Sequence, residues 1–101
     1  LDEYDTEVEI EEQNDGSLLM DGLLPIDVLK EKLAVDELPD EFKAGYQTLS
    51  GFVMNQMGKI PKVGQSFEWD RFTFKITEMD GLRVERVEIA RIPDQEDDQR
   101  V

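Results

Sequence analysis

The chain has 101 residues, a formal net charge of −14 at pH 7, and neither cysteine nor histidine. This length allows one domain with a modest core. The missing residue types exclude disulfides, zinc-thiolate sites and the Ser-His and Cys-His catalytic pairs, and the acidity disfavours nucleic acid and anionic lipid as partners. The acidity favours cations and basic protein surfaces instead. Neither an apolar run near 18 residues nor a signal peptide occurs, and because the chain starts without Met, we expect it to be a piece of a longer protein.

The N-terminal stretch is acidic, with seven Asp and Glu side chains in residues 1–12. Charged and apolar residues alternate there, which predicts a strand with one solvent-facing side from about Val8. Residues 14–16 read Asn-Asp-Gly, which is typical of a turn, and a short apolar strand follows at residues 17–20. The two strands should form a hairpin that ends at Asp21-Gly22.

Two short helices are predicted in the middle of the chain. Pro25 suits a first helical position, and apolar residues at helical spacing extend the first helix to Leu33. Residues 38–42 are expected to form a loop, because Pro39 disfavours the helical conformation at the residue before it.

The second helix, which Thr48 can cap, is the element on which the rest of the chain should pack. Gly58 can take the left-handed conformation at its end, and Pro61 prevents continuation. Gly51 inside the helix costs about 1 kcal/mol relative to Ala, which predicts close approach to the backbone of a sheet. The residues of its apolar stripe are Leu49, Phe52, Val53, Gln56 and Met57.

Three strands are predicted after Gly64, at residues 66–69, 72–79 and 82–91. The Asp80-Gly81 turn would join the last two. It would pair Met79 with Leu82, Phe74 with Val87, Phe72 with Ile89, and Glu78 with Arg83. One face would then be apolar (Phe72, Phe74, Ile76, Val87 and Ile89), and the other would face solvent (Thr73, Lys75, Thr77, Arg86 and Glu88).

The predicted fold is therefore α+β, with two short helices packed on one face of a mainly antiparallel sheet. The residues after Pro93 lack apolar periodicity and are expected to be disordered or loosely attached.

No residue is singled out as catalytic, cofactor-binding or metal-ligating. The carboxylates lie mainly in polar runs, which favours solvated surface over paired catalytic acids. Asp-Gly pairs at 15–16, 21–22 and 80–81 are explained by turns, because none continues as a calcium loop. Residues 58–64 lack the pattern of a phosphate-binding loop. Phe42 and Trp69 could line a pocket, but core packing is favoured for both.

Several short motifs occur in a fixed order. They are Asp15-Gly16-Ser17, Asp21-Gly22, Tyr-Gln-Thr-Leu-Ser-Gly-Phe at 46–52, Gly-Lys-Ile-Pro-Lys-Val-Gly at 58–64, and Phe72-Thr73-Phe74 before Asp80-Gly81. Together they resemble the CorC/HlyC transporter-associated domain, in which the helix usually reads Thr-Leu-Ala-Gly and is followed by Gly-Arg-Ile-Pro and then Gly-Glu or Gly-Asp. Ser50, Lys59 and Gln65 are mild departures. Residues 1–5 also resemble the end of the CBS pair that precedes this domain in such proteins.

The resemblance implies a division into an acidic linker with the first strand (1–13), the transporter-associated domain (14–92) and an acidic tail (93–101). It implies a parent protein with a membrane domain and a CBS pair, and places this piece at the cytoplasmic face of the cell membrane. Such parents are described as magnesium and cobalt efflux proteins or as hemolysins. The fold is similar to part of the FAD-binding domains of certain oxidases. The family supplies no catalytic residues.

The function expected from this resemblance is a non-enzymatic regulatory or interaction module of a divalent-cation transport or efflux protein. The alternative is a nucleotide-binding module of FAD type, and a small carboxylate hydrolase is disfavoured. We expect no tightly bound cofactor: FAD is suggested by fold resemblance only, and Mg²⁺ or Ca²⁺ would associate weakly. The expected partners are the CBS pair and membrane domain of the parent, with a homodimer also allowed, and neither nucleic acid nor lipid.

Overall fold

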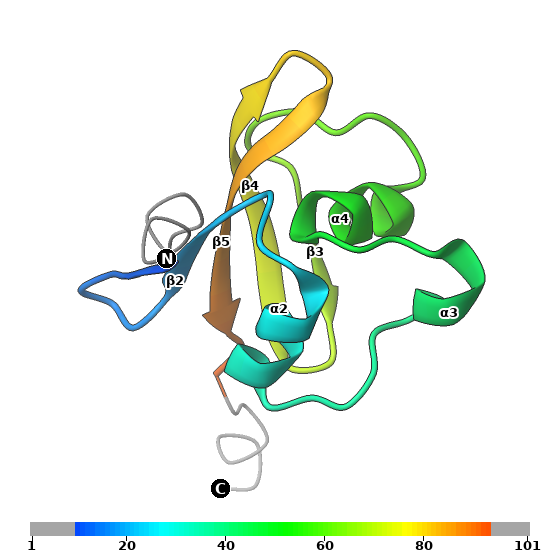
Figure 1. Ribbon diagram of the computed structural model, residues 1–101. Helices are drawn as coiled ribbons and strands as arrows, with labels where there is room; N and C mark the ends of the chain where they lie inside the picture. Colours follow the sequence, from blue (N-terminus) through cyan, green and yellow to red (C-terminus); the bar gives the residue numbers. More distant parts are fainter. Residues whose placement is uncertain (1–9, 94–101) are drawn as a thin grey trace, which may run out of the picture.

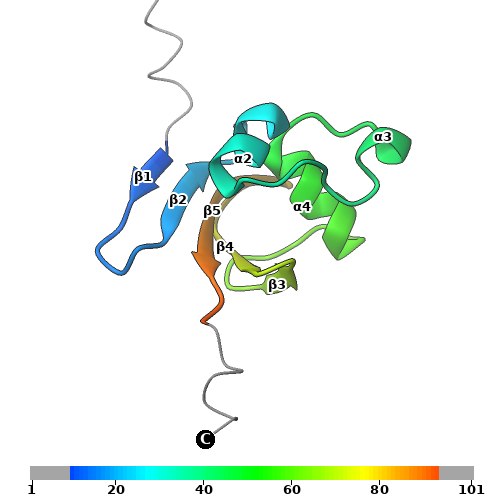
Figure 2. The ribbon, with the colours of Figure 1, turned by 90° about the horizontal axis from the view of Figure 1, so that it is seen from below.

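The computed structural model describes residues 10–93, which form a five-stranded antiparallel sheet with helices on one face (Figures 1 and 2). The strand order is β1-β2-β5-β4-β3. The strands are β1 (Ile10–Glu12), β2 (Leu18–Asp21), β3 (Ser66–Trp69), β4 (Phe72–Asp80) and β5 (Arg83–Arg91). The helices are α2 (Ile26–Leu33), α3 (Glu41–Ala44) and α4 (Leu49–Met57). The α+β class is confirmed. The start of the first predicted strand and the tail expected to be disordered lie outside the described residues.

The β1–β2 hairpin forms at the predicted turn. Ile10 pairs with Met20, and Glu12 with Leu18. The side chain of Asp15 accepts a hydrogen bond from the Ser17 N–H at 3.0 Å, which is the local bond that makes Asp favourable in turns.

Helix α4 forms where it was predicted, and α2 begins one residue later than predicted, because Pro25 is extended (ψ 144°) and is not the first helical residue. Pro25 directly precedes α2. At the start of α4, Thr48 Oγ1 accepts a hydrogen bond from the Gly51 N–H at 3.2 Å, and Gly58 ends the helix in the left-handed conformation with φ 73°. Ser50 is buried on the inner side of α4, whereas Gln56 and Met57 in the predicted stripe are only half-buried.

The prediction that Gly51 approaches a sheet backbone is wrong. A Cβ at Gly51 would lie 2.9 Å from the Cβ of Tyr46, which precedes the helix. The close approach to the sheet occurs at Gly22 instead, where a Cβ would lie 2.1 Å from the carbonyl oxygen of Val84. Gly22 therefore lets the corner after β2 pack directly on β5.

The prediction of a loop over residues 38–42 is wrong at its end, because α3 begins at Glu41. Pro39 restricts only the residue before it, so helix can start after Asp40. The Glu41 side chain also accepts a hydrogen bond from the Leu38 N–H at 3.1 Å, which satisfies a free amide at the start of the turn.

The β4–β5 hairpin has the predicted faces but a different register. Asp80 pairs with Arg83, so Gly81-Leu82 is the two-residue loop, and the positive φ of Gly81 suits the first position of such a turn. Three of the predicted pairs were wrong by two residues, because Phe74 pairs with Ile89, Phe72 with Arg91 and Met79 with Val84. The fourth was wrong by three, because Glu78 pairs with Arg86 next to an irregularity. A shift of two leaves every side chain on the same face.

The predicted apolar face is buried along both strands, and it meets α2 and α4 in one core. Of the residues predicted to face solvent, Lys75 is exposed, and Thr73, Thr77, Arg86 and Glu88 are half-buried. The hairpin also contains two compensating irregularities. Ile76 pairs with Val87 and Met79 with Val84, so Thr77 and Glu85 are extra residues on their strands.

Candidate functional site

The acidic clusters at both ends of the chain fall largely outside the described residues. Glu11, at the edge of that region, is exposed on β1. Within residues 10–93, the structure contains no group of three or more His, Cys, Asp or Glu side chains placed to hold a metal ion. The Asp-Gly pairs act in turns: Asp21 accepts from the Leu23 N–H at 2.8 Å, and Asp80 pairs with Arg83 at 3.1 Å.

Ser17 is the centre of a small polar cluster under the β1–β2 hairpin. Its hydroxyl lies 2.7 Å from Asp15 Oδ1, 3.0 Å from Gln13 Oε1 and 3.2 Å from Glu88 Oε2. Hydrogen bonds from the side chain and backbone of Ser17 lower the pKa of Asp15. Because Glu88 is on β5, this cluster joins the hairpin to the middle of the sheet.

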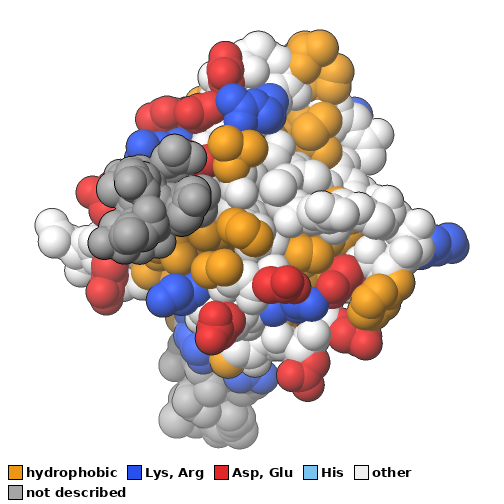
Figure 3. Space-filling model, in the orientation of Figure 1, with side chains coloured by type: hydrophobic (Ala, Val, Ile, Leu, Met, Phe, Trp, Pro, Cys, Tyr) orange, Lys and Arg blue, Asp and Glu red, His pale blue; other side chains and the backbone are white. Residues whose placement is uncertain are grey.

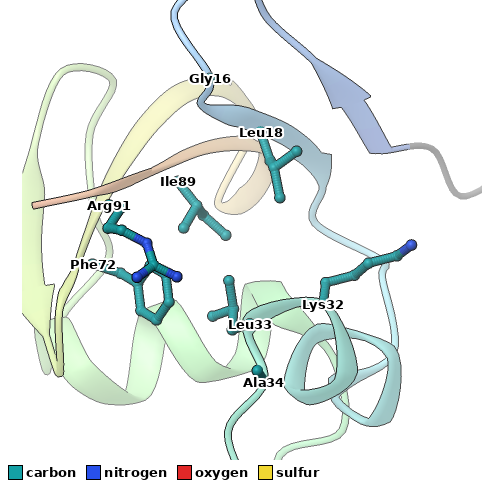
Figure 4. Close-up of a pocket in the computed structure, with 8 residues that line it drawn as sticks. All are labelled: Gly16, Leu18, Lys32, Leu33, Ala34, Phe72, Ile89 and Arg91. Atoms are coloured by element: carbon teal, nitrogen blue, oxygen red, sulfur yellow. The ribbon is translucent and has the colours of Figure 1, made fainter.

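An open cavity of about 220 Å³ lies beside the end of α2 (Figure 4). The Arg91 guanidinium lies over the Phe72 ring, 5.6 Å from its centroid. The Lys32 ammonium points away from the apolar side chains in the close-up. Gly16, Leu18, Lys32, Leu33, Ala34, Phe72, Ile89 and Arg91 line the cavity. The cavity therefore has apolar side chains at its base and one guanidinium beside them. Its volume is smaller than the roughly 300–1,000 Å³ of typical ligand pockets.

The segment around α3 is held by a set of contacts that we call the α3 clasp (Lys30, Leu38, Pro39, Glu41 and Tyr46). Lys30 Nζ donates to Glu41 Oε2 at 2.7 Å, and the Tyr46 hydroxyl donates to the Pro39 carbonyl oxygen. Leu38 is buried in the core.

The carboxylate of the clasp is nearly enclosed, since 8% of the Glu41 side chain is exposed. The hydrogen bond with Glu41 raises the pKa of Lys30, and the same bond lowers the pKa of Glu41. Burial raises the pKa of Tyr46 to about 12, and the nearby carboxylates of Glu41 and Asp40 add to the rise. The clasp therefore stays ionised as a Lys-Glu pair, with a neutral tyrosine, at neutral pH.

The core packing predicted for Phe42 is wrong, because 79% of this residue is exposed on α3. Leu38 occupies the core instead. Trp69 does pack against the core, edge-on to Phe52 with ring centroids 6.0 Å apart. Within residues 10–93, the other exposed large hydrophobic residues are Leu23, Ile60, Val63 and Leu82. The spacing of Leu38 and Glu41, which allows the acid to bind the earlier amide, is the sequence signal that could have identified α3.

None of the helices described in residues 10–93 is long and apolar enough to cross a membrane.

Comparison with known proteins identifies relatives of much greater length. A UPF0053 protein of Synechocystis sp. is 41% identical over 88 residues, which are 87% of this chain and 20% of that protein. The polyamine export protein of Escherichia coli K12 is 33% identical over 86 residues, 85% of this chain and 19% of that protein. The chain thus spans about a fifth of the length of these relatives.

Solved structures share the fold. The CorC_HlyC domain of a Xylella fastidiosa hemolysin, determined in complex with Mg²⁺ and Mn²⁺, has a TM-score of 0.72 and 33% identity, covering 83% of this chain and 98% of that one. The domain from Nitrosomonas europaea has a TM-score of 0.72 and 30% identity, and the match covers 81% of this chain and 94% of that one. The family model for the transporter associated domain matches residues 11–93. The chain therefore belongs to the CorC_HlyC family of transporter-associated domains.

Proposed function

We propose that this domain is a non-enzymatic regulatory and interaction module of a larger cation-transport protein. The observation that carries the proposal is the family match over residues 11–93, combined with relatives about five times longer that include polyamine export proteins. The domain has a core of its own, so it can act as a separate body within a parent. Its proposed place is the cytoplasmic face of the cell membrane, next to a CBS pair and a membrane domain of the same polypeptide.

The proposed cargo is a cation. The resemblance stated above suggests magnesium and cobalt, and the Xylella relative was solved with Mg²⁺ and Mn²⁺. The name of the Escherichia coli relative suggests polyamines, which are organic cations. A transport assay with both classes of cation distinguishes these cargoes.

The experiment compares the full parent with a parent lacking residues 11–93, both reconstituted in vesicles. A regulatory module leaves transport possible without the domain but changes its rate or its dependence on the cytoplasmic ion concentration. Identical transport curves for the two proteins would overturn the proposal.

The alternative function, a nucleotide module of FAD type, finds less support in the described residues. A dinucleotide needs donors for its pyrophosphate, and the cavity beside α2 offers one guanidinium within a chain of net charge −14. We propose that FAD binds no more tightly than about 100 μM, or about −5.5 kcal/mol. A flavin absorbance titration of the purified domain that saturates at low micromolar FAD would establish the alternative.

A further inference from the structure

Phe42 on α3 is the most exposed large hydrophobic residue among residues 10–93, and it forgoes the free energy that burial would provide. A single exposed apolar residue is common on proteins and by itself indicates no partner. Phe42 differs because the segment that carries it is firmly held. In both ribbon views, α3 stands apart from the sheet and from the other helices (Figures 1 and 2).

The α3 clasp holds in place the short helix that carries Phe42. The clasp joins α3 to α2 through the Lys30–Glu41 pair and anchors the preceding residues through buried Leu38. The ring of Tyr46 packs on Phe52 in the core, with centroids 5.6 Å apart. An aromatic side chain on a prearranged support loses little conformational freedom on binding, which is a property of residues that dominate interfaces.

The surface beside Phe42 is acidic. Asp36, Glu37 and Asp40 are exposed in the same segment, and Lys43 is the one exposed cation between residues 36 and 44. Figure 3 shows hydrophobic and acidic side chains next to each other on the side of the molecule where α3 lies. Such a surface fits a partner with an apolar pocket rimmed by Lys or Arg. A second copy of this chain fits poorly, because it carries the same charge of −14.

We infer that Phe42 is the anchor by which this domain docks into a basic-rimmed apolar pocket on another part of its own parent polypeptide. The relatives are long enough to contain such a pocket elsewhere in the chain, because about four fifths of their length lies outside the matched region. The inference rests on the proposed function and adds to it the contact surface and the chemistry of the partner.

The test is a binding titration in trans. The domain can be used alone, because the Xylella structure consists almost wholly of the corresponding domain. Fluorescently labelled domain is titrated with the parent lacking residues 11–93. Phe42→Ala should weaken binding about tenfold or more, as loss of an aromatic anchor does. Val63→Ala, at a residue that is 60% exposed, is the matched control and should change the affinity less than about twofold.

Two further measurements complete the test. Thermal unfolding of the Phe42→Ala domain should match the wild type, since the side chain is exposed. Raising the salt concentration from about 0.1 M to about 1 M shortens the screening length from about 10 Å to about 3 Å and should weaken wild-type binding.

Unchanged affinity of Phe42→Ala, salt-independent binding, or Phe42-dependent binding between two domains would each overturn the inference. Failure of the wild-type domain to bind in trans would overturn it as well. None of these results decides the proposed function, which the transport assay of the truncated parent tests separately.

Discussion

Phe74, in the middle of β4, shows how single residues hold this core together. It has no exposed surface, and its ring is stacked on Phe67 with centroids 5.0 Å apart. It also meets Phe52 of α4 edge-on at 5.5 Å. Because these rings belong to β3, β4 and α4, one side chain connects three elements, and such aromatic pairs contribute beyond their buried area.

Phe74→Ala should reduce the free energy of unfolding by about 3–5 kcal/mol, because it removes a buried ring and leaves a cavity. Thr73→Ala, on the opposite face of the same strand, should change it by no more than about 0.5 kcal/mol. Urea unfolding followed by circular dichroism measures both. Similar stabilities for the two variants would mean that the faces of β4 are assigned wrongly.

The Lys30–Glu41 pair makes stability depend on pH at both extremes. The folded pKa of Glu41 lies below its ordinary value of 4.5, so its contribution is full above 4.5 and is lost as the pH falls through the folded value. The folded pKa of Lys30 lies above 10.5, so its contribution is full below 10.5 and is lost as the pH rises through the folded value.

Glu41→Gln should therefore lower the melting temperature at neutral pH, and the difference from wild type should shrink as the pH falls below 4.5. Glu37→Gln is the control, because Glu37 is exposed and forms no ion pair among the described residues. A constant difference for Glu41→Gln across the acid range would show that the ion pair does not stabilise α3.

At the scale of elements, the corner between β2 and α2 is bound to the start of α4. Gly22 donates its N–H to the Glu85 carbonyl oxygen at 2.8 Å and accepts from the Ser50 N–H at 2.8 Å. Leu24 accepts from the Leu49 N–H at the same distance. These bonds satisfy the amides at the start of α4 that the helix itself leaves free.

Gly22→Ala should destabilise the domain by about 1–3 kcal/mol or more, because the new Cβ would overlap the Val84 carbonyl and force the corner away from β5. Gly16→Ala is an informative comparison. Apart from its chain neighbours, no atom of residues 10–93 lies within 4 Å of its Cβ position, so only its φ of +91° opposes the change. Chemical unfolding should show the larger loss for Gly22→Ala. The reverse order would contradict the close packing at Gly22.

Sequence patterns predicted the elements whose signals are local. The Thr48 cap, the Gly58 end of α4 and the alternation along β4 are each contained in a few neighbouring residues. Helix α3 was missed because it is too short to show a helical pattern, and its one local signal is the spacing of Leu38 and Glu41. Its contact with Lys30 comes from another helix. Because α3 was not predicted, the exposure of Phe42 on this helix was not predicted either.

The β4–β5 register was missed for a different reason. A Gly in a two-residue turn is compatible with more than one loop position, and the local rule selected Asp80-Gly81 instead of Gly81-Leu82. The irregularities at Thr77 and Glu85 have no local sequence signal that fixes where they lie. The cavity beside α2 could not be predicted either, because its lining comes from four separate parts of the chain.

At the scale of the whole molecule, charge is the dominant property. A net charge of −14 on 101 residues attracts cations to the surface in general. A tight calcium site needs six or more oxygen ligands in place, and magnesium gives up its water ligands reluctantly. Within residues 10–93, no cluster of three or more acidic side chains is placed to provide such a site.

Calorimetric titration of the domain with Mg²⁺ or Ca²⁺ at physiological salt should therefore show only weak association at about millimolar concentration. Asp15→Asn together with Glu88→Gln should leave the isotherm unchanged, because the Ser17 cluster contains only these two carboxylates. A stoichiometric site of micromolar affinity that is lost in named carboxylate variants would make this domain an ion sensor and contradict the prediction.

The two irregularities in the β4–β5 hairpin compensate each other, because each adds one residue to its own strand at nearly the same level of the sheet. Inward-facing residues are three positions apart at this point on both strands, Ile76 and Met79 on one and Val84 and Val87 on the other, so the two strands change phase together. Losing Thr77 alone or Glu85 alone would leave one strand out of phase with its partner, whereas losing both would restore continuous alternation through to the tip. At this point of the hairpin, deletion of a single residue therefore keeps both inward faces aligned only when one residue is also deleted from the other strand.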